Sequence, residues 1–208
     1  MESFKKCIIY FFFSFSSLIA QDNQLFYDWS SQEIKKANTA LNEDYLTLEE
    51  KNIFLVLNLV RINPPLFSKT ILANYRGVEG FSNDFLKNQK YLNSLSNRLL
   101  ETAPLNLVFP DKELWKSAEC HATKSGKRGV IGHRRSGCKE PDLPYSECCS
   151  YGLDMAIDIV IQLLIDYKVR DLSHREIMLN PKQTVMGVSI KPHKNYLYNA
   201  VLDFSSDL

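Results

Sequence analysis

The sequence predicts an α+β fold in which helices pack on an antiparallel sheet, and two observations lead to this class. Apolar residues recur at the spacing of an α-helix in most segments between residues 47 and 179. From residue 184 on, the period changes to the alternation that is typical of β-strands, over 184–191 and again over 196–204. Residues 192–195 join the two and predict a hairpin turn. Helices followed by a terminal hairpin indicate layered α+β packing.

Local signals place the individual elements. Thr47 and Glu50 form a capping-box pattern that begins a helix, and this helix ends at Asn63, before two prolines. A further helix is expected between Asp111 and Gly129. Other helical stretches are expected over residues 66–76, 83–101, 155–167 and 173–179. Residues 130–150, which carry Gly, Pro, Ser and three cysteines, are expected to form a loop held by disulfides.

Length and composition indicate one compact domain. The chain has 208 residues, of which 45% are hydrophobic, so it can build a substantial core. Its 25 Lys and Arg residues are balanced by 24 Asp and Glu residues. A nucleic-acid-binding protein normally carries a basic excess, and this chain has none, so no nucleic-acid partner is expected.

The first twenty residues predict a signal peptide for export. Lys5 and Lys6 precede an apolar run that ends at Ala20, and polar residues follow. The run is shorter than the roughly 20 residues of a membrane-spanning helix, although an uncleaved N-terminal anchor is the alternative. We therefore expect a secreted or periplasmic protein with no transmembrane anchor after cleavage, in which residues 21–46 are a lead-in segment and residues 47–208 form the domain.

The cysteines agree with export. Removal of Cys7 leaves four, which is an even number suited to disulfides in an oxidising compartment. A bond between the adjacent Cys148 and Cys149 would be strained. Cys120 and Cys138 are therefore each expected to pair with one member of this adjacent pair. A metal cluster or a catalytic thiol is the alternative use of these side chains.

Three of the four histidines lie in the segment that also holds these cysteines. His133, Glu147 and His174 each stand where a loop or a helix end is expected, and there a side chain can point into a cleft. Two imidazoles and a carboxylate can hold a divalent ion such as zinc, or the carboxylate can orient an imidazole without metal. On spacing alone, histidines at the surface or in the core remain an alternative.

The order of several short segments resembles the CAP superfamily, which contains cysteine-rich secretory proteins, antigen 5 and pathogenesis-related 1 proteins. The similarity is greatest to a bacterial secreted branch of its SCP-like domain and covers roughly residues 47–204. The segments that carry it are 57–64, 114–122, Gly132-His133, 147–152, 173–181, 186–188 and Asp203-Phe204. The chain departs from the family pattern at Cys148, where Asn is frequent, and at Ser173, where Gly is frequent.

This resemblance implies a three-layer α/β/α sandwich with a central, mainly antiparallel sheet. It also implies a shallow cavity lined by two histidines, which can bind a divalent metal, and two acids. His133 and His174 would be the histidines and Glu147 the first acid. Asp166 lies near the place of the second acid. However, it continues a polar helix face with Asp158 and Gln162, so a solvated side chain is the stronger expectation for it.

The function expected is that of a secreted, non-enzymatic binding module. A divalent metal at His133 and His174 would be one ligand, and the resemblance adds an apolar or sterol-like lipid or an extracellular protein. The alternative is a metal-assisted hydrolase of peptide or cell-envelope material with Glu147 as general base. A thiol hydrolase that uses Cys148 or Cys149 with His133 is a third hypothesis.

Four other histidine and arginine side chains are not expected to line the cavity. His121 is expected to pack in the core or to support a site, and His193 to lie in solvent at the hairpin turn. Arg134 and Arg135 are expected to be an exposed basic pair, which could also bind a phosphate or a carboxylate.

Overall fold

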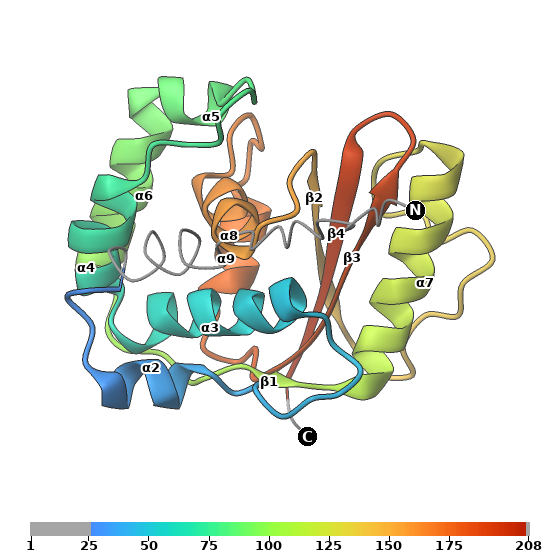
Figure 1. Cartoon of the computed structure of the whole chain (residues 1–208), viewed down its shortest axis with the longest axis horizontal. Helices are drawn as coiled ribbons and strands as arrows, with labels where there is room; N and C mark the ends of the chain where they lie inside the picture. The colour runs from blue at the N-terminus through green and yellow to red at the C-terminus, as the bar shows by residue number, and fades with distance from the viewer. Residues whose placement is uncertain (1–25, 207–208) are drawn as a thin grey trace, which may run out of the picture.

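The computed structural model describes residues 26–206 and confirms the α+β fold class. A four-stranded sheet lies between two layers of helices, with helix α7 (Lys112–Arg128) on one face and α3 (Leu48–Ile62) and α8 (Ala156–Ile165) on the other (Figure 1). The predicted signal peptide and residues 21–25 lie outside the described residues. Within residues 26–206, no helix is both long and apolar enough to cross a membrane.

The sheet has the strand order β1-β3-β4-β2. Strands β3 (Val185–His193) and β4 (Leu197–Ser205) form the predicted antiparallel hairpin. Strand β2 (Ser146–Tyr151) pairs antiparallel with β4, and the two-residue β1 (Phe109–Pro110) pairs parallel with β3. The sheet is therefore mainly antiparallel, and the β2 register places Glu147 opposite Asp203.

Strand β2 corrects the expectation of a loop through residue 150. Its sequence contains no β-branched residue, and Tyr151 at its end is the only residue of a type that is enriched in strands, so local propensity for a strand is weak. The strand exists because the free side of β4 supplies hydrogen-bond partners for its backbone. Its alternation then places Cys148 in the main core and Cys149 in the smaller cluster beneath α7.

The helices begin and end close to the predicted positions, with two differences. Thr47 caps α3 with the reciprocal capping box, and Asp111 caps α7. The helical segment expected from residue 66 begins earlier, as α4 (Pro64–Phe67), because proline is tolerated in a first helical turn, and continues as the π-helix η1 (Ser68–Leu72). The segment expected over 83–101 is divided at Asn88 into α5 (Asp84–Lys87) and α6 (Gln89–Glu101).

The described part of the lead-in segment belongs to the domain. It forms the capped helix α2 (Ser31–Ala37), and its residues Trp29, Ala37 and Ala40 are buried in the main core. Asn58 of α3 donates a hydrogen bond to the carbonyl of Ala37 over 3.0 Å. The segment is thus a packed part of the fold.

Helix α7 packs directly on the sheet because β3 offers a glycine at the contact. A Cβ atom on Gly187 would overlap the backbone of Leu114 and Trp115. This close approach brings the buried face of α7 onto β3 and β4, and it fixes the position of the loop that follows α7.

Candidate functional site

The structure brings the two predicted histidines together. His133 lies in the loop after α7, and His174 lies in the first turn of α9 (Ser173–Met178). Their ring centroids are 6.3 Å apart, although the residues are far apart in the sequence. His133 has 60% of its side chain exposed and His174 has 16%, so the pair is open to solvent from one side.

Each imidazole is oriented by a carboxylate at Nδ1. Nδ1 of His133 lies 2.7 Å from Oε1 of Glu147, and Nδ1 of His174 lies 2.7 Å from Oδ1 of Asp166. An ionised carboxylate can only accept a hydrogen bond, so each Nδ1 atom carries a proton, and in the neutral form of each ring the Nε2 atom keeps its lone pair. This is the arrangement in which histidines bind metal ions through Nε2.

Asp166 corrects the expectation of a solvated side chain. It is buried, and its Oδ2 atom accepts hydrogen bonds from the backbone N–H groups of His174 and Arg175, at 3.0 and 3.3 Å. Helix α8 ends at Ile165, and Asp166 adopts a left-handed backbone with φ of 55°. The helix, and with it the polar face that the sequence indicates, therefore ends one residue before Asp166. The Asp166 side chain points inward to α9.

Two buried arginines fix the helix that carries His174. Arg175 donates to the carbonyls of Leu164 and Ile165 at the end of α8, over 2.6 and 2.9 Å. Arg61 of α3 donates to the carbonyl of Met178 at the other end of α9, over 2.6 Å. Burial lowers the pKa of Arg61 to about 10, so the side chain remains a cation at neutral pH. Both ends of α9 are thus held to the core.

Arg135 corrects the expectation of an exposed basic pair, whereas Arg134 is exposed. The Arg135 side chain is buried, and its Nη2 atom binds both Glu147 and Asp203. It also donates from Nη1 to the Ser117 hydroxyl of α7 over 2.6 Å. Glu147 therefore has both carboxylate oxygens engaged, one by Arg135 and one by His133.

Asp203 is fully buried below this ion pair, and its Oδ2 atom has no hydrogen-bond partner among the described residues. Burial raises the pKa of Asp203 to about 7; the Arg135 cation opposes the rise and the Glu147 carboxylate adds to it. Two carboxylates thus share a single guanidinium inside the protein.

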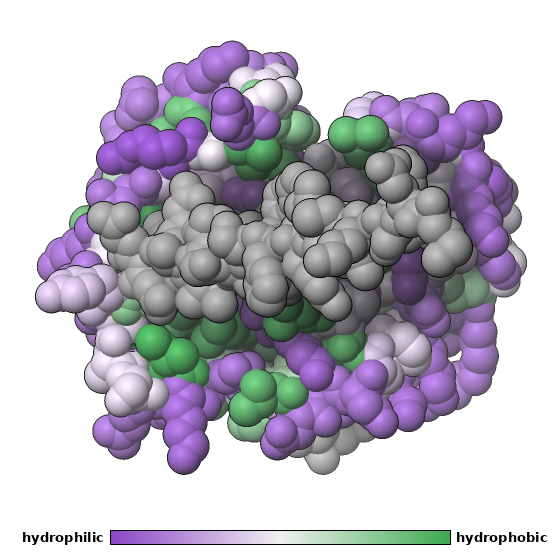
Figure 2. Space-filling model, viewed as in Figure 1, coloured by the Kyte–Doolittle hydropathy of each residue, from purple (hydrophilic) through white to green (hydrophobic). Residues whose placement is uncertain are grey.

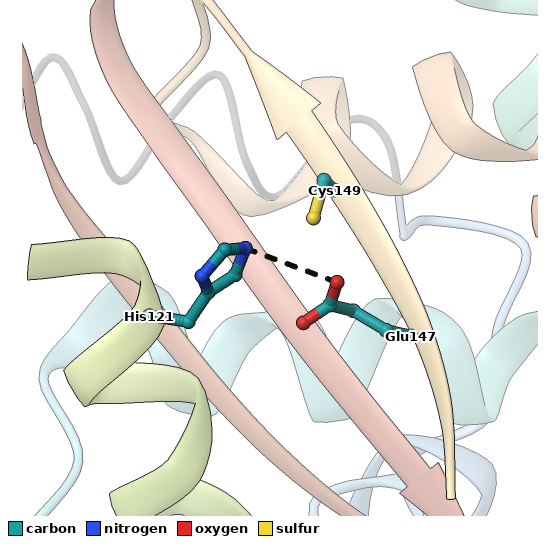
Figure 3. Close-up of side chains that lie close together, drawn as sticks. All are labelled: His121, Glu147 and Cys149. Carbon is teal, nitrogen blue, oxygen red and sulfur yellow. Dashed lines mark ion pairs between the residues drawn. The ribbon is translucent and has the colours of Figure 1, made fainter. Parts of the chain in front are cut away.

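A second group of side chains on the α7 side can also hold a metal ion. His121 of α7, Glu147 and Cys149 of β2 point toward one another, and their potential ligand atoms all lie within 4.8 Å of one another (Figure 3). His121 Nε2 is 3.9 Å from Glu147 Oε1 and 3.0 Å from the Gly132 carbonyl oxygen. Burial lowers the pKa of His121, which favours the neutral imidazole that a metal needs.

Cys149 and His121 were not expected to form one constellation with Glu147. The expectation that His121 is buried and supports a site agrees with its position. The available signal was the spacing of Glu147 and Cys149: residues two apart on a strand share a face, and His121 lies on the buried face of α7. Using that signal required knowledge that residues 146–151 form a strand.

The disulfide pattern differs from the expected one. Cys120 and Cys138 are bonded to each other, with Cα atoms 5.8 Å apart, and Cys148 and Cys149 are free. Neighbouring strand residues point to opposite faces of the sheet, so the Cys148 side chain lies in the main core and the Cys149 side chain lies against α7. The disulfide ties to α7 the loop that carries His133 and Arg135.

His193 is also placed differently from the expectation of a solvated side chain. It is buried, its Nε2 atom lies 3.1 Å from the Val130 carbonyl oxygen, and its Nδ1 atom accepts the backbone N–H of Asn195. The hairpin turn folds back over the end of α7, and this covers the ring. His193 does not belong to the site.

No protein-family model matches the chain, and no curated protein matches it. Among solved structures, the chain is similar to an outer surface protein from Borrelia burgdorferi. The two share 17% sequence identity with a TM-score of 0.40, over 64% of this chain and 100% of that chain. A likeness at this level carries no argument about function, and the site must be interpreted from its own chemistry.

Proposed function

We propose that the protein is a secreted, CAP-type binding module that holds a divalent metal ion, with zinc preferred, between His133 and His174. One observation carries this proposal: a carboxylate orients each imidazole at Nδ1, and the two solvent-accessible rings lie with their centroids 6.3 Å apart. Imidazole nitrogens suit zinc, and a carboxylate behind each ring increases the basicity of the coordinating nitrogen.

The two rings must move slightly closer to share one ion. Zinc binds imidazole nitrogen at about 2.0–2.1 Å in tetrahedral geometry, which places the centroids of two rings coordinated through Nε2 roughly 5.2 Å apart. The observed centroid distance of 6.3 Å exceeds this by about 1 Å. His133 is the more exposed of the two and can move toward His174 on binding. Two protein ligands leave coordination positions for an external donor, which suits a binding module.

The position of Glu147 favours binding over turnover. A general base must have a carboxylate oxygen free to take a proton from water. Both oxygens of Glu147 are engaged, by His133 and by the Arg135 cation. The hydrolase alternative therefore requires that Arg135 releases Glu147, and no contact among the described residues favours that release.

The free thiols do not favour a thiol hydrolase. Cys149 Sγ lies 3.8 Å from Nδ1 of His133, but that nitrogen is bonded to Glu147. Burial raises the pKa of the Cys149 thiol well above its usual range, and the Glu147 carboxylate adds to this rise. A nucleophilic cysteine needs a lowered pKa.

Export and an apolar ligand are the remaining parts of the proposal. The Cys120–Cys138 disulfide supports an oxidising compartment. A cavity of about 420 Å³ between η1 and α6 offers a place for an apolar ligand, since Leu72, Leu86 and Leu92 line it beside polar residues. The lipid and any protein partner stay predictions.

Isothermal titration with zinc tests the metal site. The expected result is one ion bound per chain, with binding abolished in His133→Ala and in His174→Ala. Glu176→Gln, in the same helix as His174, is the matched control and should bind zinc as the natural chain does. Cys149→Ser separates the two candidate groups. Zinc affinity that is lost in Cys149→Ser and kept in His174→Ala would overturn the proposal and place the ion at His121, Glu147 and Cys149.

A further inference from the structure

The tip of the β3–β4 hairpin and the loop after α7 together expose an unusual number of large apolar side chains. Leu197 is 75% exposed and Ile131 is 59% exposed. We call this surface the hairpin-tip patch, and it consists of Val130, Ile131, Tyr196, Leu197 and Tyr198. Figure 2 shows hydrophobic surface bordered by hydrophilic residues at the end of the molecule where Figure 1 places this turn.

Hydrogen bonds hold the two segments of the hairpin-tip patch, the hairpin turn and the loop after α7, next to each other. The backbone N–H of Lys194 donates to the Gly126 carbonyl over 3.0 Å, and the Asn195 side chain donates to the Gly129 carbonyl over 2.8 Å. The Tyr196 ring packs on the buried His193 ring, with centroids 5.2 Å apart. The patch is therefore fixed by the fold before any partner arrives.

Leu197 is poorly explained by folding alone. Its backbone φ is 66°, in the left-handed region that favours Gly or Asn, and its side chain lies mostly in water. An Asn at this position would relieve the backbone strain and remove an exposed apolar group. A leucine that is unfavourable on both counts is expected where an apolar side chain serves an external contact.

The surroundings of the patch are basic. Lys127, Arg128 and Lys194 are exposed beside it, and none of them forms an ion pair within residues 26–206. The sequence has no Asp or Glu between Lys124 and Lys139, and none between Lys191 and Leu202. This local excess stands out in a chain whose formal net charge is +1.

We propose that the hairpin-tip patch docks on the surface of an anionic lipid bilayer. Aliphatic and tyrosine side chains with basic residues around them are the combination that enters the boundary between headgroups and acyl chains. A second copy of this chain fits less well, because symmetric contact through the patch would bring the basic residues of both copies together. Ile131 is two residues before His133, so docking would hold the histidine pair close to the bilayer.

Flotation with vesicles tests the proposal, using phosphatidylcholine with and without phosphatidylserine. The chain should bind only the anionic vesicles, and added salt should weaken binding because it screens the basic residues. Leu197→Asn should weaken binding at least about tenfold through the lost apolar burial. The charge reversal Lys127→Glu with Arg128→Glu should weaken it at least about tenfold as well.

The controls separate docking from folding. Leu197→Asn should unfold at the same or a higher urea concentration than the natural chain, because Asn tolerates a positive φ. Leu41→Asn changes another exposed leucine, in the turn that follows α2, and should leave vesicle binding unchanged. That turn lies beside β1, away from the hairpin tip, since Thr39 donates to the Val108 carbonyl over 2.8 Å. These controls make a loss of binding specific to the hairpin-tip patch.

Three results would overturn the proposal. The first is absence of binding to either vesicle, and the second is equal binding to neutral and anionic vesicles. The third is a dimer in sedimentation that Leu197→Asn dissociates while vesicle binding stays the same, which would assign the patch to contact between copies of the chain.

Discussion

His174 and Asp166 are joined twice. Nδ1 of the imidazole lies 2.7 Å from Oδ1 of the carboxylate, and the backbone N–H of His174 donates to Oδ2 of the same group over 3.0 Å. One buried side chain thus fixes both the start of α9 and the orientation of the ring. The orientation of the His174 ring therefore depends on the left-handed residue Asp166, which ends α8.

Replacement of Asp166 by Asn should therefore weaken zinc binding while the ligands themselves remain. The neutral amide no longer increases the basicity of the His174 ring, and loss of such a supporting carboxylate typically lowers metal affinity about 10–100-fold. Competition with a chromophoric chelator measures this change. Glu176→Gln removes an exposed carboxylate from the same helix and should bind like the natural chain. Equal affinities in all three chains would mean that Asp166 only supports the fold.

Removal of the disulfide should affect both stability and the metal site. Cys120→Ser together with Cys138→Ser opens a loop of 18 residues, which should lower the free energy of unfolding by about 3 kcal/mol. The same loop carries His133 and Arg135, so zinc affinity should fall as well. Urea unfolding and zinc titration of the double variant measure the two effects. Full zinc affinity in the double variant would show that the Glu147 and Asp203 contacts hold the loop alone.

The free thiols should be detectable only after unfolding. In a chain with Cys7→Ser, unfolding without a reductant should expose two reactive thiols, those of Cys148 and Cys149. The folded chain should react slowly even at mildly alkaline pH, because burial raises the pKa of both thiols. Titration with a chromogenic disulfide reagent counts them. If no thiol reacts after unfolding, Cys148 and Cys149 are instead bonded to Cys120 and Cys138.

Asp203 should make stability fall as pH rises. Burial raises its pKa to about 7 in the folded chain, from an ordinary value of 3.8. Between these pH values the folded chain binds more protons than the unfolded chain, so the free energy of unfolding decreases with increasing pH. Asp203→Asn should remove this decrease. The difference between the two chains in urea unfolding from pH 4 to 8 isolates Asp203 from His121, whose lowered pKa acts in the opposite direction. If the free energy of unfolding depends on pH in the same way in both chains, the raised pKa does not belong to Asp203.

Arg61→Met should destabilise the chain by about 3 kcal/mol or more, because buried backbone carbonyls lose their donors. Besides Met178, the guanidinium donates to the carbonyls of Asn106, Asn180 and Gln183. Arg76→Met is the matched control at an exposed arginine and should change stability by less than about 0.5 kcal/mol. Chemical denaturation compares the three chains. Similar free energies of unfolding for both variants would show that water replaces the Arg61 guanidinium as the hydrogen-bond donor to these carbonyls.

Local signals were sufficient for most helices and for the terminal hairpin. The capping box of Thr47 and Glu50, the apolar spacing of α3 and α8 and the alternation of β3 and β4 all operate within a few residues. They were insufficient for β2, whose strand geometry depends on pairing with β4, a strand that follows much later in the sequence. The position of Cys149 depends on that pairing, and so does the disulfide pattern.

The site was predicted in part for the same reason. Positions at expected loops and helix ends made His133, Glu147 and His174 candidates, and the resemblance to the CAP superfamily favoured a site over histidines at the surface or in the core. The sequence could not indicate that Asp166 turns inward, because that depends on a left-handed residue at the end of α8 and on the donors that α9 brings to it. Nor could it indicate that Arg135 leaves the surface to join Glu147 and Asp203.

The amino-acid sequence by itself determined the fold class and most helix boundaries, because hydrophobic period and capping act between near neighbours in the chain. Only the tertiary structure decided the inward position of the Asp166 carboxylate, the cysteine pairing and the basic, apolar hairpin tip. These features depend on which groups meet after the chain has folded, and the burial of each charge or thiol is a property of the neighbours it meets there.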